Sequence, residues 1–325
     1  MQRRDFVKLL GGAAATVGWP LKALAQRPAM TRVGIVTIQP RTAPIFATFG
    51  QRLRELGYAD GQNLVLDFLN PEQQPGGNAG VIEEFLRRKV DVILVPYEST
   101  LKAALAAKAA VPIVMIAIDY DPLAHGYVKS LAQPGGNVTG LYLQQLDLAR
   151  KRVELMAQAL PGVKAATVFW DSVSEDQWQA TSKAAATFGL RLANVELSNQ
   201  PYDYDAALAQ VPPDYRSVVI FCLSPVFYRD RQRLADFTLR NKIATVFGLR
   251  EWVDAGGVFS YGVNFPAMYK RAAEFVDAIA KGAKVSELPI EQPTKFELIL
   301  NTKVAEAIGV TISPAILVRS DEVIE

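Results

Sequence analysis

Short apolar runs that end in polar residues recur along this chain. The clearest run is Val92–Val95, which is mostly β-branched and stops at Pro96. Such an unbroken run is typical of a strand that is buried on both faces of a parallel sheet. The residues Tyr97–Thr100 and then an alanine-rich, helix-like stretch follow it. The pattern therefore places a ring, a carboxylate and two hydroxyls at a strand–helix junction, where open α/β sheets bind ligands and where the same residues can also act as caps.

The same rhythm of strand and helix continues through the chain. Apolar runs predict further strands at 31–38, 63–69, 111–118, 165–170, 191–197, 217–223, 244–247, 258–260 and 296–301. Helical spacing of apolar residues predicts helices at 45–56, 81–89, 101–110, 148–160, 177–189, 204–210, 228–241, 268–281 and 302–308. This alternation predicts the α/β class, with doubly wound parallel sheets.

The rhythm starts twice, which predicts two lobes. The stretch 135–145, GGNVTGLYLQQ, has two glycines, a short β pattern and a polar exit, and we interpret it as a crossing between lobes. We expect the first lobe at 31–140 and the second at 144–262, each of ordinary domain size. We expect residues 265–325 to return to the first lobe, so that several crossings together form a hinge.

The ends of the predicted strands carry the candidate binding residues. They mix aromatic rings, hydroxyls, carboxylates and one arginine, as expected for a cleft that encloses a small polar molecule with flat apolar parts. The candidates are Gln39, Tyr97, Glu98, Ser99, Asp119, Tyr120, Trp170, Asp171, Ser172, Ser224, Phe227, Arg250, Tyr261 and Asn264.

Several of these residues allow two interpretations. Arg250 is suited to a bidentate contact with a ligand carboxylate, or to a surface ion pair with Glu251 or Asp254. Trp170 is suited to stacking on a ligand or to packing between lobes. Asp119 and Asp171 are suited to accepting hydrogen bonds from a ligand amino group or to capping the next helix.

Composition and charge narrow the function. Of 325 residues, half are hydrophobic and 21% are charged, which is typical of a globular protein. Without the first 25 residues, 31 basic and 32 acidic residues remain, a formal charge of −1, so nucleic acid is not an expected partner. One cysteine, Cys222, and one histidine, His125, argue against a disulfide, a cysteine or histidine metal cluster and a Ser-His-Asp triad.

The first 25 residues resemble a twin-arginine export signal. Arg3, Arg4, Phe6 and Lys8 match the Arg-Arg-x-Phe-x-Lys pattern, with a valine where a leucine is usual. An apolar stretch too short to span a bilayer follows, and 23–25, Ala-Leu-Ala, fits a cleavage site. We expect removal of the signal near Ala25 and a location in the periplasm.

Motifs for chemistry are absent from the sequence. It contains no phosphate loop of the Walker type, no G-x-G-x-x-G after a strand and no H-E-x-x-H. We therefore expect no catalytic residues, no metal and no cofactor, and we favour binding over catalysis.

Five segments resemble one known family. They are GGNVTGLYL (135–143), DAGGVFSYGVN (254–264), RAAEFVDAIAKGAK (271–284), LPIEQPTKFELILNTKVAEAIGVTI (288–312) and RSDEVIE (319–325). They are similar to substrate-binding proteins of ABC transporters whose better-known members bind tryptophan or tyrosine. The resemblance covers nearly all of the chain after the signal. It implies a periplasmic binding protein of type I, a Venus-flytrap that closes on its ligand and presents it to a membrane permease.

The predicted function is that of the periplasmic solute-binding component of an ABC importer. We expect a monomer that binds an amino acid or a related aromatic or carboxylate compound between its lobes. A sensor partner of a membrane receptor would use the same cleft and is the alternative. An exported hydrolase that uses strand-end carboxylates is a third, less favoured hypothesis.

Overall fold

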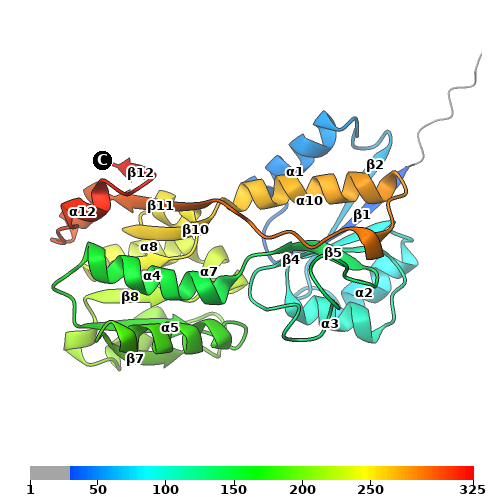
Figure 1. Cartoon of the computed structure of the whole chain (residues 1–325). Helices are drawn as coiled ribbons and strands as arrows, with labels where there is room; N and C mark the ends of the chain where they lie inside the picture. Colours follow the sequence, from blue (N-terminus) through cyan, green and yellow to red (C-terminus); the bar gives the residue numbers. More distant parts are fainter. Residues whose placement is uncertain (1–29) are drawn as a thin grey trace, which may run out of the picture.

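The computed structural model describes residues 30–325, and the predicted export signal lies outside these described residues. Within them the strands form two sheets, and each sheet with its helices makes one lobe (Figure 1). No helix among residues 30–325 combines the length and the apolar character needed to cross a membrane.

The first lobe contains a parallel sheet with the strand order β2-β1-β3-β4-β5. Its elements in chain order are β1 Thr31–Val36, α1 Pro44–Glu55, β2 Leu64–Leu69, α2 Gly77–Arg87, β3 Val92–Val95, α3 Glu98–Ala106, β4 Ile113–Ala117 and β5 Val138–Tyr142. Strands β3, β4 and β5 are buried along their whole length because they lie inside the layers of helices.

The second lobe begins immediately after β5. Its elements are α4 Gln145–Ala159, β6 Ala165–Trp170, α5 Glu175–Thr187, β7 Arg191–Glu196, α6 Tyr204–Ala209, the 3₁₀ turn Pro213–Tyr215, β8 Val218–Phe221, α7 Pro225–Arg229, α8 Arg231–Arg240, β9 Ala244–Phe247, α9 Arg250–Asp254 and β10 Phe259–Val263. The helix predicted at 228–241 is two helices. The first starts earlier than predicted because the Ser224 hydroxyl accepts from the Phe227 N–H at 3.2 Å and Pro225 occupies the first turn.

The remaining segment divides between the lobes. Its elements are α10 Phe265–Ala280, the 3₁₀ turn Val285–Glu287, β11 Phe296–Asn301, α11 Thr302–Ala307, α12 Pro314–Leu317 and β12 Glu322–Ile324. Helix α10 lies along α1 in the first lobe, where the Arg52 guanidinium is 2.9 Å from the Glu274 carboxylate (Figure 1).

The prediction that all of 265–325 returns to the first lobe is wrong for β11 and everything after it. Strand β11 pairs antiparallel with β10, and β12 pairs parallel with β11, which gives the second sheet the order β12-β11-β10-β9-β8-β6-β7. The physical reason is the open edge of β10, whose backbone N–H and C=O groups need a partner strand.

Three segments join the lobes: the residues between β5 and α4, Asn264 between β10 and α10, and residues 288–295. The third runs beside the first, because the Glu291 N–H donates to the Gly140 carbonyl and the Tyr142 N–H donates to the Glu291 carbonyl, each at 2.9 Å. Figure 1 shows this segment passing β5 on its way to β11. Neighbouring crossings of this kind permit one lobe to rotate against the other.

Candidate functional site

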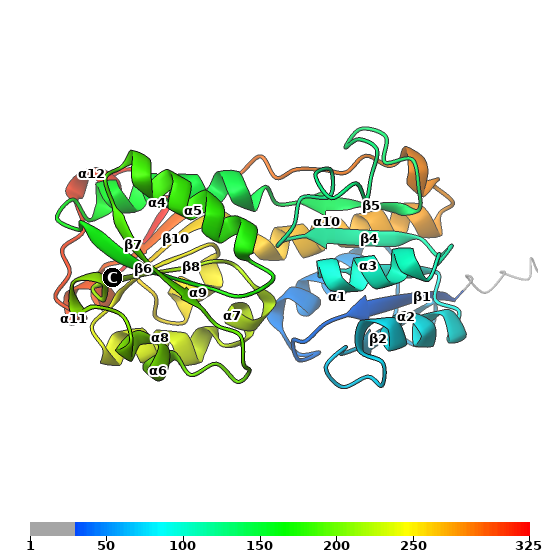
Figure 2. The ribbon, with the colours of Figure 1, turned by 90° about the horizontal axis from the view of Figure 1, so that it is seen from below.

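A cavity of about 260 Å³ lies between the lobes, where strands of both sheets end. Figure 2 shows the loops after these strands in the middle of the molecule. The cavity is lined by Ile38, Pro71, Glu72, Asn78, Tyr97, Ser99, Asp119, Asp171, Ser172, Val173, Gln200, Tyr202, Pro225 and Val226. Five of these were predicted from strand ends: Tyr97, Ser99, Asp119, Asp171 and Ser172.

A second, smaller space of about 20 Å³ adjoins the cavity and is almost filled by side chains. Gln39, Tyr97 and Ile118 from the first lobe meet Ser224 and Tyr228 from the second there. Tyr97 lines both spaces, and its hydroxyl accepts from the Ile38 N–H at 3.0 Å. The side chains around the smaller space bring the two lobes into contact, and the partly open cavity lies beside this contact.

Asp119 is the most unusual residue of the cavity. It follows β4, it is only 8% exposed, and its Oδ1 atom has no hydrogen-bond partner among the described residues. Burial raises the pKa of the Asp119 carboxyl to about 8, because desolvation, with smaller contributions from the charges of Glu98 and Asp171, outweighs nearby backbone N–H groups. A buried, unpartnered carboxylate at a cavity wall is typical of a functional site.

Asp171 holds the corresponding position in the second lobe, directly after β6. It is 2% exposed, and burial raises the pKa of its carboxyl. Hydroxyl donors oppose that effect: Ser174 Oγ donates at 2.8 Å and the Tyr202 hydroxyl donates at 3.3 Å. The same Ser174 closes the turn that starts α5, so Asp171 is fixed in place by its own loop.

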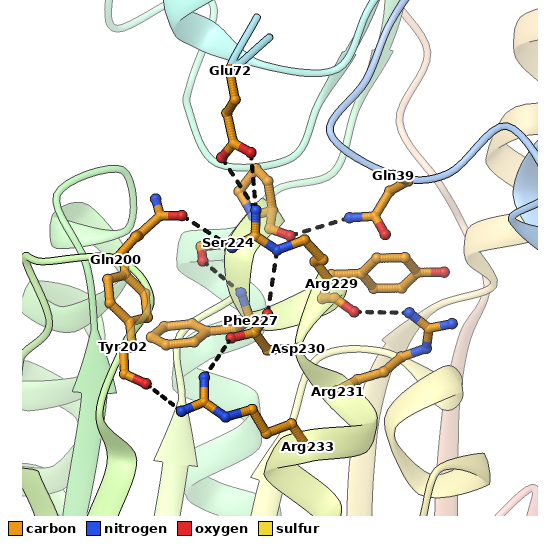
Figure 3. A network of polar contacts seen from close by, with 12 residues as sticks. Gln39, Glu72, Gln200, Tyr202, Ser224, Phe227, Arg229, Asp230, Arg231 and Arg233 are labelled. Carbon is orange, nitrogen blue, oxygen red and sulfur yellow. Dashed lines mark hydrogen bonds and ion pairs between the residues drawn. The ribbon is translucent and has the colours of Figure 1, made fainter. Parts of the chain in front are cut away.

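Polar contacts join the lobes at the rim of the cavity. Arg229 Nη1, at the end of α7, lies 3.1 and 3.2 Å from the two carboxylate oxygens of Glu72, and Arg229 Nη2 donates to Gln200 at 3.0 Å (Figure 3). Gln39 Nε2 donates to the Pro225 carbonyl at 3.3 Å. These contacts link the loops after β1 and β2 to the second lobe and stabilise the closed arrangement.

Glu98 lies behind the cavity, and it belongs to a second bridge between the lobes. It pairs with Lys102 at 3.0 Å and with His125, whose other ring nitrogen is 3.8 Å from Asp176 at the start of α5. Burial alone would raise the pKa of Glu98, but hydrogen bonds from Tyr127, Lys102 and His125 hold it below the usual value. Glu98 is therefore occupied by protein partners.

The other predicted residues do not reach the cavity. Tyr120 is buried with its hydroxyl toward Met115 Sδ at 3.6 Å, and Phe227 is fully buried in the second lobe. The Trp170 ring stacks on Trp178 at 6.5 Å, and its N–H donates to Asn194. All three point into the interior of a lobe.

Three further candidates lie at the far side of the second sheet or at the hinge. Arg250 forms ion pairs with Asp254, at 3.3 Å, and with both carboxylate oxygens of Glu322 on β12. Tyr261 packs near Phe296, with ring centroids 6.1 Å apart. Asn264 caps α10 by accepting from the Ala267 N–H at 2.9 Å. Arg250 is therefore committed to the ion-pair role rather than turned toward the cavity.

Four polar residues of the cavity were not predicted: Glu72, Asn78, Gln200 and Tyr202. Glu72 comes from the loop between β2 and α2, Asn78 from the first turn of α2, and Gln200 and Tyr202 from the loop after β7. Their one signal in the sequence is that the segments containing them follow predicted strands, as the predicted candidates do.

Two larger hollows lie elsewhere, of about 500 Å³ along β7 and about 550 Å³ beside Arg250. Both are formed by the second lobe and its connection to the hinge. The interlobe cavity differs because both lobes contribute an acidic side chain that is more than nine-tenths buried, Asp119 and Asp171.

The stability of the unliganded protein is expected to fall as the pH rises from about 4 to about 8. Asp119 has a folded-state pKa above its unfolded value, so its contribution is fully present below the unfolded pKa and is lost as the pH rises through about 8. Glu251, whose pKa burial raises to about 7, adds to the same trend. Melting temperatures measured between pH 5 and pH 9 test this expectation. The slope should be shallower in Asp119→Asn, and equal slopes in both proteins would contradict the assignment.

The architecture defines the class: two doubly wound lobes, joined by three crossings and closed over a cavity at their strand ends, form a periplasmic binding protein of type I. The predicted fold class is confirmed. The family model described as ABC transporter substrate binding protein matches residues 39–324, so the chain belongs to that family. The resemblance noted in the sequence is thereby confirmed, and the family consists of substrate-binding proteins, which are typically extracytoplasmic.

Known proteins are similar to this chain over most of its length. A tyrosine-binding protein of Clostridioides difficile is 25% identical over 277 residues, 80% of this chain and 75% of its own length. A conserved domain protein from Vibrio cholerae is 23% identical, covers 91% of this chain and 99% of its own, and has a TM-score of 0.80. An ABC domain from Streptococcus pneumoniae in complex with L-Trp is 21% identical, covers 91% of this chain and 100% of its own, and has a TM-score of 0.78.

Proposed function

We propose that this protein is the periplasmic solute receptor of an ABC importer and binds one small molecule in the cavity between its lobes. The observation that carries the proposal is the pair Asp119 and Asp171, one from each lobe, buried at the wall of one cavity between the lobes. The family and the relatives that bind tyrosine or L-Trp support an amino acid or a related compound.

The mode of action follows from the hinge. In an open form, water would solvate the strand-end polar groups. A ligand that contacts both lobes would favour the closed form, because it adds interactions that exist only when the lobes meet. The closed form would then present one face to a membrane permease as a monomer.

A thermal-shift screen tests the proposal. The protein should gain stability by mass action, about 2.7 kcal/mol when a ligand is present at a hundred times its Kd. The screen should include amino acids, their amides and amines, and aromatic acids. If no compound in a broad metabolite library raises the melting temperature, the receptor function is refuted.

The location is tested separately. Arg3, Arg4 and the small residues at 23–25 support export by the twin-arginine route. N-terminal sequencing of the protein from the periplasmic fraction should find a start near Gln26. An intact Met1 would contradict export with cleavage.

The ion pair between Glu72 and Arg229 at the rim of the cavity should contribute modestly to ligand affinity. Glu72→Gln should weaken binding of the best compound from the screen about two- to fivefold, since a half-exposed ion pair contributes about 0.5–1 kcal/mol. The matched control is Asp214→Asn, which removes an exposed ion pair with Arg191 at 3.0 Å inside the second lobe. Calorimetric titration measures both. Equal affinity losses in the two variants would show that the Glu72 contact does not act through closure.

A further inference from the structure

Acidic side chains outnumber basic ones around the interlobe cavity. Three carboxylates line it, from Glu72, Asp119 and Asp171. Arg229 neutralises Glu72 at the rim. No lysine or arginine from residues 30–325 lines the cavity, so Asp119 and Asp171 face it without a cationic partner there.

The two remaining carboxylates are not equivalent. Asp171 receives hydroxyl hydrogen bonds from Ser174 and Tyr202, which stabilise a carboxylate but carry no positive charge. Asp119 Oδ1 is buried with no partner among residues 30–325. Closure places the Asp119 and Asp171 side chains at the wall of one cavity, where burial weakens the screening of charge by water.

We propose that the ligand carries a net positive charge, through an ammonium or amidinium group that contacts both Asp119 and Asp171. This inference rests on the proposed receptor function and narrows its substrate class. A zwitterionic amino acid would satisfy the carboxylates with its ammonium, but its own carboxylate would be a further anion without a cationic side chain beside it. An amine, an amino-acid amide or an amino acid with a basic side chain meets the charge balance of the site.

Binding by this mode has a consequence for protons. In the closed, empty cavity, burial raises the pKa of Asp119 to about 8, so the carboxyl holds a proton at neutral pH. When the cationic group contacts the Asp119 side chain, the carboxyl ionises and its proton passes to solvent. Binding near pH 7 should therefore release up to one proton, and the release should vanish above about pH 9.

Matched triplets of compounds test the inference with the intact protein. Each triplet contains an amino acid, its amide and its deaminated acid, for example tyrosine, tyrosinamide and 3-(4-hydroxyphenyl)propionate, with leucine, phenylalanine and tryptophan equivalents. Lysine and arginine are added as amino acids with a basic side chain. Calorimetric titration at pH 7 in two buffers of different ionisation enthalpy gives the affinity and the number of protons released.

The amide of the best triplet should bind at least tenfold more tightly than the amino acid, the deaminated acid should not bind, and proton release should accompany binding. An amino acid or acid that binds more tightly than its amide, or a best solute that is neutral or anionic, would overturn the inference and leave the receptor function standing. Failure of every compound in the triplets and in the metabolite screen would overturn the receptor function, and the inference with it.

Discussion

Asp119→Asn is expected to lower the affinity for the best cationic ligand at least a hundredfold while the protein stays folded. The substitution keeps the shape of the side chain and removes the carboxyl group that would ionise against the cationic ligand. Loss of one member of a buried charge pair typically costs about 3–5 kcal/mol, which corresponds to a factor of at least about a hundred in Kd. Calorimetric titration of wild type and variant with the same compound measures this difference.

Asp119→Asn should not lower the stability of the unliganded protein. Without ligand, the variant no longer buries an ionisable carboxyl, so at pH 8 its melting temperature should be at least that of the wild type. Asp214→Asn is the control for loss of one surface carboxylate and should change neither quantity. An Asp119→Asn protein that binds as tightly as the wild type would show that this carboxylate does not contact the ligand.

Gly140→Ala is expected to destabilise the fold by about 3 kcal/mol or more. Gly140 lies on β5 with φ +130°, in a region that L side chains rarely adopt, and an added Cβ would lie 2.1 Å from the Met115 carbonyl oxygen on β4. That oxygen belongs to the backbone of a buried strand, so it cannot move aside without breaking the sheet.

Gly136→Ala is the matched control within the same segment. An added Cβ there meets nothing within 4 Å, and the backbone is not in the left-handed region. Urea unfolding of both variants, compared with the wild type, separates the two positions. Equal unfolding midpoints would mean that Gly140 is not required by the close approach of β4 and β5.

The central strands of both sheets were predictable because most of them are buried on both faces. Val92–Val95 is continuous in apolar residues and is fully buried, and 165–170 and 296–301 were predicted with the bounds that the structure has. The partner of 296–301 was not predictable in the same way. Apolar composition marks a strand but does not say which open edge the strand will join.

The candidate site was predictable where a polar residue directly follows a buried strand. Asp119 and Asp171 satisfy that condition, and both line the cavity. Trp170 fails because alternate residues of a strand face opposite sides, and its side carries Trp178 rather than the cavity. Glu72 and Gln200 come from polar loops, whose direction depends on how the two lobes meet, and no local pattern contains that information.

The proposed binding mode places a small cationic molecule between the lobes, held by Asp119 and Asp171. A crystal structure of the protein with the compound that raises its melting temperature most tests this claim directly. We predict closed lobes, with a ligand nitrogen about 2.7–3.2 Å from a carboxylate oxygen of each residue. Ligand bound instead in the groove along β7 or beside Arg250, with the interlobe cavity unoccupied, would contradict it.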